Sequence, residues 1–326
     1  MSGFWADKQA VVTGAGGFLG SQVVDHLQAA GCAHVFAAHS RAYDLTDAAA
    51  VGRMFAAAAA ARPAGMPFVV FHIAGLAGGI AAHLARPAEF FYHNVVMNTL
   101  TLHQAWQAGA LRLVAAGAGN GYPVRSPNPL QEHTLWDGYP QPETAPYGLA
   151  KRLLAAQSLA YWQQHGFASS VAILGNLYGP RDKFDSPQSP VIAALISKFV
   201  AAVEAGHAPV TAWGTGRATR DLVYVGDVAE ALVRAAEVYS DAQVFNVASG
   251  SDTSIRQVVE LLARLTGFQG EVQWDTSKPD GQSARRFDID KARRELGWQP
   301  RTDLETGLQQ TVAWYRARRA SEAAHA

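Results

Sequence analysis

Two side chains in the stretch PYGLAK are spaced to share one proton-transfer chemistry. Tyr147 and Lys151 are four residues apart, so on a helix both emerge on the same face, one turn apart. A neighbouring ammonium favours the phenolate and lowers the pKa of a tyrosine. Such a tyrosine can exchange a proton with an oxygen that changes between carbonyl and alcohol during hydride transfer. Taken alone, the same spacing is also typical of an ordinary amphipathic helix surface.

A glycine-rich stretch near the N-terminus supplies a second signal. TGAGGFLG has glycines at 14, 17 and 20, directly after an expected strand and at the start of an expected helix. Glycine permits a tight turn and a close approach of the backbone to a pyrophosphate, and the helix N-terminus offers free N–H groups. The alternative is a glycine-rich turn without a ligand. Because the pattern opens an alternating α/β chain, it predicts dinucleotide binding.

The end of the second expected strand bears on which dinucleotide binds. Enzymes that use NAD usually place an acid there to hold the ribose 2′-hydroxyl. This chain instead has His39, Ser40 and Arg41, with the first acid at Asp44. Serine and arginine suit a 2′-phosphate better than a diol, so we predict NADP(H), with NAD(H) possible and an exposed loop arginine as the simpler interpretation.

A third stretch, LVAAGAGNGYP, reads as a buried strand that opens into a loop of glycine and alanine. Between Gly117 and Gly121 it carries no hydroxyl, thiol or charge. Such a loop leaves room beside the Tyr/Lys pair. It contributes little chemistry besides its backbone N–H groups and the Asn120 amide.

The elements that must position these residues alternate along the first half of the chain. Continuous apolar strands alternating with helices predict a Rossmann-type, doubly wound α/β fold with a parallel sheet covered on both faces. After residue 180 the rhythm changes, and we expect a smaller C-terminal substrate-binding lobe. We expect a dinucleotide-binding domain at 1–175, a mainly substrate-binding lobe at 176–316 that shares some strands with the first domain, and a frayed tail at 317–326. Expected strands lie in 9–16, 34–40, 68–75, 111–119, 170–179, 219–225 and 243–250, and expected helices in 20–31, 46–63, 191–206, 227–239 and 254–267.

Composition excludes several classes of partner. The 326 residues contain 27 Lys+Arg and 27 Asp+Glu, so no excess charge points to nucleic acid or a membrane surface. No apolar run approaches the ~20 residues that span a bilayer, and the N-terminus shows no signal-peptide pattern. The single cysteine, Cys32, cannot form an internal disulfide, which fits a reducing compartment. We expect a cytoplasmic protein with no metal site.

Together, the TGxxGxxG and YxxxK patterns resemble the extended short-chain dehydrogenase/reductase family. The stretches GNLYGPRDKFDSP, TAWGTGRATRDLVYVGDVAEA and DTSKPDGQSARRFDID are similar to its GDP-L-fucose synthase branch. The resemblance runs from the first strand to about residue 310. It implies a 3,5-epimerase/4-reductase of a GDP-linked 4-keto-6-deoxy hexose that works as a homodimer through its long helices.

The resemblance also implies roles for individual residues. Tyr147 and Lys151 match the catalytic pair. The cofactor-binding set that it implies is Gly14, Gly17, Phe18, Leu19, Gly20, Ser40, Arg41, Asp44, Leu45, Ala74 and Asn94. The substrate-binding set is Asn120, Asn176, Lys198, Trp213, Arg220 and Lys278, with the cations on a nucleotide diphosphate. Each of these cations, taken singly, could be a solvated surface charge.

Three chemical groups of the family pattern are missing from this chain. Relatives carry Ser-Ser-Cys where this chain has Ala118-Gly119-Asn120, and a histidine where it has Pro190. The first serine of relatives hydrogen-bonds the reacting oxygen, while the cysteine and the histidine are their acid/base groups for epimerisation. His72, His83 and His93 are candidate substitutes, although each is more simply an ordinary histidine.

We therefore expect an NAD(P)-dependent oxidoreductase that transfers hydride at C4 of a nucleotide-activated sugar, with the epimerase half in doubt. One alternative is a nucleotide-sugar 4-epimerase or dehydratase with tightly bound NAD. Another is a non-catalytic cofactor-binding partner protein, which retention of Tyr147 and Lys151 disfavours.

Overall fold

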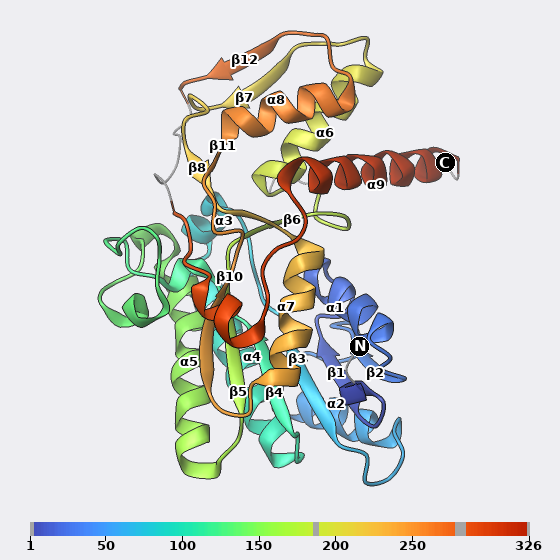
Figure 1. The fold of residues 1–326 in the computed structure, drawn as a ribbon, viewed down its shortest axis with the longest axis vertical. Helices are drawn as coiled ribbons and strands as arrows, with labels where there is room; N and C mark the ends of the chain where they lie inside the picture. The colour runs from blue at the N-terminus through green and yellow to red at the C-terminus, as the bar shows by residue number, and fades with distance from the viewer. Residues whose placement is uncertain (1–2, 185–188, 278–284, 325–326) are drawn as a thin grey trace.

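The computed structural model describes residues 3–184, 189–277 and 285–324 (Figure 1). Its centre is a parallel sheet of six strands in the order β10-β5-β4-β3-β1-β2. This arrangement confirms the predicted α/β fold with a doubly wound parallel sheet. The strands are β1 (Gln9–Thr13), β2 (His34–Ala38), β3 (Phe68–His72), β4 (Arg112–Ala116), β5 (Ser169–Leu174) and β10 (Gln243–Val247).

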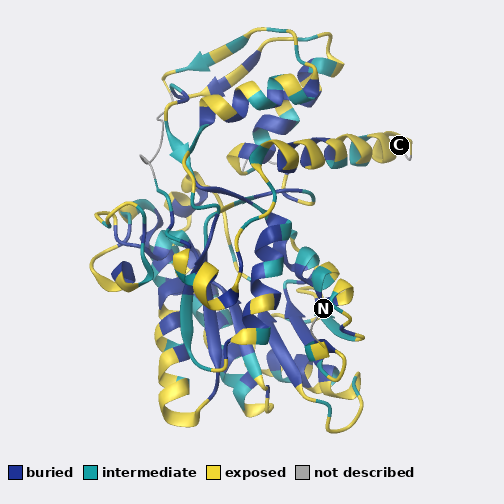
Figure 2. Ribbon diagram, viewed as in Figure 1, coloured by how far each residue is buried: buried dark blue, intermediate teal, exposed yellow. Residues whose placement is uncertain are grey.

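Helices cover both faces of this sheet, because successive strand residues point to opposite sides and nearly all of them are apolar. Val11, Val70 and Leu113 face the layer of α2, α4 and α5. On the other face Val12 and Phe71 pack with α1 and α7. Figure 2 shows the strands as the buried centre between helices with exposed outer faces. The helices are α1 (Phe18–Ala29), α2 (Ala48–Ala60), α4 (Pro87–Gln107), α5 (Ala145–His165) and α7 (Val225–Val238).

The strand order reverses direction between β1 and β3, which are neighbours in the sheet. In open α/β sheets this switch point leaves a crevice outside the carboxyl ends of the strands, where ligands bind. The loops after β1, β3 and β4 all begin at this edge. The same edge carries the short helix α3 (Ile80–Ala85).

The second lobe has a separate apolar core. It lies above the carboxyl edge of the sheet in Figure 1. Its helices are α6 (Val191–Glu204), α8 (Ile255–Thr266) and α9 (Leu304–Ala324), and its strands pair as β7 (Val210–Trp213) with β12 (Val272–Asp275), β8 (Thr219–Arg220) with β11 (Thr253–Ser254), and β6 (Asn176–Tyr178) with β9 (Leu222–Tyr224). The remaining turns of helix are η1 (Gly3–Trp5), η2 (Gly119–Gly121), η3 (Glu132–Trp136), η4 (Pro142–Thr144) and η5 (Ala292–Leu296).

The chain passes between the main sheet and the second lobe more than once. The helix expected from Asp227 begins two residues earlier, at Val225, and packs against α1 and against β4 and β5 of the main sheet. Asp227 therefore lies within the first turn of the helix, and its carboxylate accepts hydrogen bonds from the backbone N–H groups of Arg301 and Thr302. In the second half of the sequence, segments of the second lobe therefore alternate with segments that belong to the main sheet.

The C-terminal segment also differs from the expectation. Residues 317–324, which were expected to fray, continue helix α9. Arg319 pairs with Glu204 at 2.7 Å, and the Arg318 guanidinium lies 5.5 Å from the Trp314 ring. These contacts hold the last turns of the helix, which sequence position alone does not reveal. Among the described residues, no helix has the length and hydropathy needed to cross a membrane.

Candidate active site

The glycine-rich loop after β1 lies against the loop after β3. Gly14 has φ +68°, and a Cβ on it would lie 2.9 Å from the Ala74 backbone. A Cβ on Gly20 would collide with the Gly14 carbonyl oxygen, and Gly17 caps the N-terminus of α1. Side chains at 14 and 20 would therefore disrupt the turn. The loop has the form of a cradle for a pyrophosphate at the N-terminus of a helix.

Phe18 and Leu19 form the first turn of α1, where Leu19 is buried in the core beneath the loop. Leu19 therefore supports the loop from below and Phe18 is partly buried beside it. Their side chains fix where the helix N-terminus points.

The carboxyl end of β2 presents an exposed polar corner. Ser40 and Arg41 are exposed, and the imidazole of His39 reaches back over Gly16. Asp44 accepts hydrogen bonds from the backbone and the hydroxyl of Thr46, at 2.9 and 2.7 Å, which lower the pKa of its carboxyl. The first acid after β2 is thus engaged locally, next to the buried Leu45.

Tyr147 and Lys151 lie on α5 with their side chains in an aromatic and polar enclosure. The ring of His83, from α3, is 5.1 Å from the Tyr147 ring between centroids. Phe90 contacts both rings, at 4.0 Å from His83 and edge-on at 6.4 Å from Tyr147. The tyrosine ring therefore has fixed walls contributed by α3 and α4.

The Lys151 ammonium is buried at the carboxyl edge of the sheet. Its side chain is 3% exposed, and Nζ donates to the carbonyl oxygen of Ala116 at 3.0 Å. A Cβ on Gly75 would lie 3.0 Å from Lys151 Nζ and 3.2 Å from Asn94 Oδ1. The ends of β3 and β4, helix α4 and helix α5 therefore converge on one small region.

Burial controls the protonation of the pair. It raises the pKa of Tyr147 to about 12 and lowers the pKa of Lys151 to about 8. The direction is opposite to the expected lowering of the Tyr147 pKa by the ammonium, because burial removes the phenolate from water.

Asn94 holds the loop that follows β3. Its Nδ2 donates to the carbonyl oxygens of Phe90 and Leu76, at 2.7 and 3.0 Å, and its Oδ1 accepts the Leu76 N–H at 3.1 Å. Asn94 is fully buried. Apart from the bond to Phe90 in its own helix, its hydrogen bonds are with this loop, which includes Ala74 and Gly75.

A buried polar chain joins the end of β1, where the glycine-rich loop begins, to helix α5. Thr13 hydrogen-bonds His72 Nδ1, His72 Nε2 hydrogen-bonds Asn98 Oδ1, each at 3.0 Å, and Asn98 Nδ2 donates to the Ala150 carbonyl at 3.1 Å. Burial, reinforced by the charge of Lys151, lowers the pKa of His72 to about 3. His72 is therefore neutral, and its two ring nitrogens are occupied by structural hydrogen bonds.

The loop after β4 places Ala118 and Asn120 beside α5. Ala118 is buried and has only a methyl group, whereas Asn120 is partly exposed. A Cβ on Gly148, one residue after Tyr147, would collide with the Asn120 carbonyl oxygen. The loop and helix α5 are thus in direct backbone contact.

The other predicted substrate residues lie on the second lobe. Asn176 is exposed at the start of β6, and Arg220 is partly exposed on β8. Lys198 and Trp213 lie together on α6 and β7, with Lys198 Nζ 5.7 Å from the Trp213 ring and donating to the Thr211 carbonyl at 2.8 Å. Pro190 caps α6 and is exposed. Lys278 lies outside the described residues.

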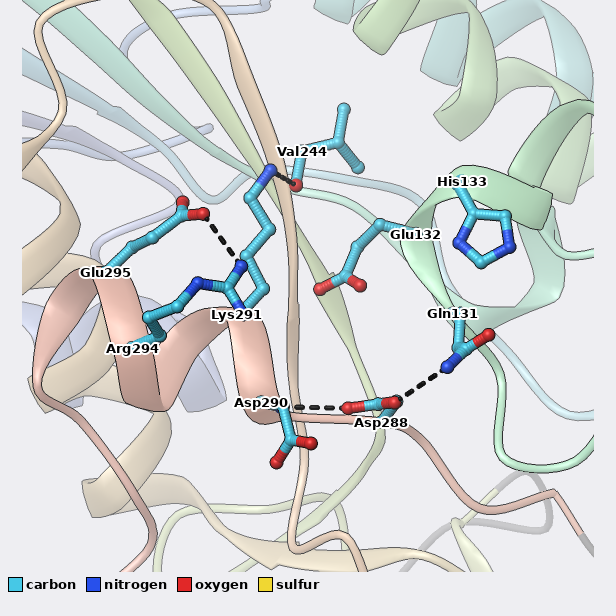
Figure 3. Close-up of a pocket in the computed structure, with 9 residues that line it drawn as sticks. All are labelled: Gln131, Glu132, His133, Val244, Asp288, Asp290, Lys291, Arg294 and Glu295. Carbon is cyan, nitrogen blue, oxygen red and sulfur yellow. Dashed lines mark hydrogen bonds and ion pairs between the residues drawn. The ribbon is translucent and has the colours of Figure 1, made fainter.

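A pocket of about 500 Å³ lies on another part of the molecule, along the edge strand β10 (Figure 3). Charged side chains line it, and many are engaged with one another or with the strand. Lys291 donates to the Val244 carbonyl at 2.7 Å, and Glu132 accepts the Asn246 N–H at 2.8 Å. These side chains seal a sheet edge. None of the predicted site residues lines this pocket.

Three residues of the site were not found from the sequence. Arg152 and Arg285 donate to carbonyl oxygens of the loop after β4, and the buried Asp221 accepts from backbone N–H groups of two further segments. The only signal was local: Arg152 follows Lys151, and Asp221 follows Arg220. Charged residues in such positions are usually solvated, so only tertiary packing shows their partners.

Comparisons with known proteins agree with this geometry. Residues 10–248 match the NAD dependent epimerase/dehydratase family. The chain is 36% identical to the probable GDP-L-fucose synthase 1 of Oryza sativa subsp. japonica, over 96% of this chain and 94% of that protein.

Two solved structures from Campylobacter jejuni have similar folds. One is a GDP-6-OMe-4-keto-L-xylo-heptose reductase, with a TM-score of 0.86 and 27% identity over 96% of this chain and 99% of that one. The other is a GDP-mannoheptose C4 reductase with NADP bound, with a TM-score of 0.84 and 26% identity over 95% of this chain and 99% of that one. The match over most of the chain confirms the predicted resemblance, and the chain belongs to the NAD dependent epimerase/dehydratase family.

Proposed function

We propose that this chain is an NADPH-dependent reductase that converts the C4 ketone of a GDP-linked sugar into an alcohol and does not epimerise C3 or C5. The observation that carries this proposal is the contrast within one site. Tyr147 and Lys151 are enclosed at the switch point of the sheet, while Ala118, Asn120 and Pro190 provide no acid or base.

The nicotinamide cofactor supplies the hydride when it is bound. Gly14, Gly17 and Gly20 fit its pyrophosphate, since side chains there would fill the cradle. Ser40 and Arg41 are exposed where a 2′-phosphate would lie, which favours NADP(H). The cofactor named for the similar C4 reductase is also NADP.

The chain's own residues handle the proton. A Tyr147 with a raised pKa is protonated at neutral pH, so its hydroxyl can donate a proton to the oxygen that develops negative charge at C4. The Lys151 ammonium stabilises the phenolate that this donation leaves behind. His83 and Phe90 keep the ring in place.

The loop after β4 sets the limits of the reaction. With a methyl group at Ala118, one hydrogen bond to the reacting oxygen is missing, which by analogy with oxyanion-hole deletions costs on the order of 10²–10³ in rate. Epimerisation at C3 or C5 needs a base on one face of the sugar and an acid on the other. Neither the Asn120 amide nor Pro190 can serve.

The substrate's nucleotide is assigned to the second lobe. Arg220 can form paired hydrogen bonds with a diphosphate, and Lys198 beside the exposed Trp213 offers a cation and a stacking surface. The GDP-sugar names of the relatives support this nucleotide.

We further propose a homodimer formed through α4 and α5. Both helices expose large apolar side chains: Phe91 and Tyr92 on α4, and Leu153, Leu159 and Trp162 on α5. Light scattering after size-exclusion chromatography should give twice the mass of the chain. A monomeric mass at micromolar concentration would contradict this assembly.

The test of the reaction is to incubate the protein with GDP-4-keto-6-deoxymannose and NADPH in D₂O. We expect slow oxidation of one NADPH for each sugar reduced, with no enzyme-dependent deuterium at C3 or C5 by mass spectrometry and NMR. A sample without protein corrects for spontaneous exchange, and Tyr147→Phe is the inactive control.

Stoichiometric deuterium at C3 and C5 with inverted configuration would contradict the claim about epimerisation. Tightly bound NAD released on denaturation would favour a 4-epimerase or dehydratase. Binding of NADPH without turnover of any 4-keto nucleotide sugar would favour a non-catalytic role.

A further inference from the structure

The loop after β4 is held by a partly buried arginine from a distant part of the chain. Arg285 donates to the carbonyl oxygens of Gly119, Tyr122 and Pro123, at 3.2, 3.4 and 2.9 Å. Burial lowers the pKa of its guanidinium. Among the residues that the structure describes, no carboxylate lies within ion-pair distance of Arg285. All of its hydrogen bonds therefore serve the backbone of this loop.

The same segment places an aromatic ring directly on the loop. Phe287 is 4% exposed, and a Cβ added to Gly119 would lie 2.5 Å from its Cζ. Only glycine fits beneath the ring. The absence of a side chain at Gly119 is thus required by Phe287 and not only by space for a ligand.

Helix α5 holds the same loop through a second arginine. Arg152, the residue after Lys151, donates from Nε to the Gly121 carbonyl at 2.9 Å and from Nη1 to the Gly138 carbonyl at 3.0 Å. Gly148 lets the helix approach the Asn120 carbonyl. Two guanidinium groups, from distant parts of the sequence, therefore bind carbonyl groups of one short stretch of backbone.

A buried carboxylate links this assembly to the strand that carries Arg220. Asp221 is fully buried and accepts from the Phe287 N–H at 3.0 Å, from the Ser249 N–H at 2.7 Å and from the Gly250 N–H at 3.1 Å. The segment that carries Arg285 and Phe287 is thereby attached next to a proposed diphosphate contact.

We propose that Arg285 and Phe287 are positioning residues that hold the loop of Ala118–Asn120 at a fixed distance from Tyr147 and connect it to the strand of Arg220. Because this loop has no reactive side chain, its backbone and the Asn120 amide are what it can offer a sugar, and these act only if the backbone is held in place. The catalytic part of this inference rests on the proposed function. That Arg285 and Phe287 hold the backbone of the loop does not depend on the proposed function.

A stabilising role alone does not account for the arginine. Even a partly buried cation loses some of its hydration, and replacing a buried charge by an apolar residue is often neutral or stabilising. Its hydrogen-bond geometry instead fixes three carbonyl groups, which orients the peptide planes of the loop. A displacement of about 1 Å in a reacting geometry can cost on the order of 10²-fold in rate.

The test compares Arg285→Met with Arg286→Met, a matched loss of charge at the neighbouring position. Hydrogen exchange is measured first in the free protein. We expect amides of residues 117–123 to exchange about tenfold faster in Arg285→Met than in wild type, and Arg286→Met to match wild type. Equal exchange in the two variants would overturn the proposal, whether or not the protein is a reductase.

Turnover of the GDP-linked 4-keto sugar is measured second. We expect kcat to fall about 10–100-fold in Arg285→Met, with the KM values for sugar and NADPH changed less than about threefold, and Arg285→Lys to recover part of the loss. A higher KM with unchanged kcat would assign Arg285 to binding and overturn the positioning role.

If Arg285→Met does not fold, as judged by circular dichroism and its melting transition, Phe287→Leu carries the same two expectations with smaller changes. Unaltered exchange and unaltered kcat in a folded Phe287→Leu would then overturn the proposal. A wild-type protein that reduces no 4-keto sugar would contradict the proposed function, and the exchange comparison would still decide whether the loop is held as described.

Discussion

Replacement of Lys151, the lysine of the proposed catalytic pair, should make the protein more stable at neutral pH. Lys151 is 3% exposed, and burial lowers its pKa from 10.5 to about 8. At 1.36 kcal/mol per pKa unit, this difference corresponds to a cost of about 3 kcal/mol for keeping the ammonium charged in the folded state. Lys151→Met keeps most of the side-chain volume and removes that cost.

The dependence on pH has a definite sign. Between pH 8 and 10.5 the unfolded chain binds more protons at this position than the folded chain does, so the stability of wild type rises with pH in that window. Below pH 8 both states are protonated and the full cost applies. Linkage then predicts that the destabilisation caused by burying the Lys151 charge shrinks by about 2 kcal/mol between pH 7 and pH 9.5.

The hydrogen bond from Lys151 to the Ala116 carbonyl opposes this gain. Its loss costs about 1–2 kcal/mol. We therefore expect Lys151→Met to be about 1–2 kcal/mol more stable than wild type at pH 7, with the advantage lost by pH 9.5. Because the loss of the hydrogen bond applies at both pH values, the change with pH in the stability difference between Lys151→Met and wild type tests the argument more directly.

The assay is urea unfolding at pH 7 and pH 9.5, without added nucleotide so that lost cofactor contacts do not contribute. Lys183→Met, at an exposed lysine, is the control and should show the same small difference at both values. A Lys151→Met protein whose stability relative to wild type does not change between the two pH values would refute the reasoning.

Other consequences follow from the same site. Tyr147→Phe should abolish turnover and leave the NADPH dissociation constant within about twofold; a variant that keeps most of its rate would place the chemistry elsewhere. Turnover should decline above pH about 8, as Lys151 loses its charge, and a flat rate to pH 9.5 would contradict this. Arg41→Ala should narrow the preference for NADPH over NADH in a fluorescence titration, and equal affinities in wild type would remove the basis for it. Gly119→Ala should lower the free energy of unfolding by about 1–3 kcal/mol because its Cβ would overlap a buried ring. The control is Gly52→Ala, which lies inside a helix with room for a methyl group and should be neutral or stabilising by up to about 1 kcal/mol.

The sequence determined the order and type of the elements of the main sheet. Buried parallel strands are continuous apolar runs, and β1, β3 and β4 are of this kind. The conformation of the glycine-rich loop was predictable because it depends on local backbone geometry, which glycines at fixed offsets reveal. That Tyr147 and Lys151 lie on the same face of a helix was likewise predictable, since residues four apart on a helix are neighbours.

The tertiary structure alone decided what surrounds those residues. The pKa of Tyr147 depends on how much water the neighbouring elements exclude, and His83 and Phe90 reach its ring from α3 and α4. The helical tail after residue 316 likewise depends on a distant partner, Glu204, for its contact with Arg319.

The loop of glycine and alanine shows this division most directly. Its composition was plain from the sequence, and it indicated only what chemistry was absent. Arg285 and Phe287 lie more than 160 residues away along the chain, and their contacts with Gly119 are formed only when the chain returns from the second lobe to the sheet. Sequence patterns report interactions between neighbours along a helix or strand, whereas contacts at such separation leave no periodic trace, so the reason for each glycine was decided by packing.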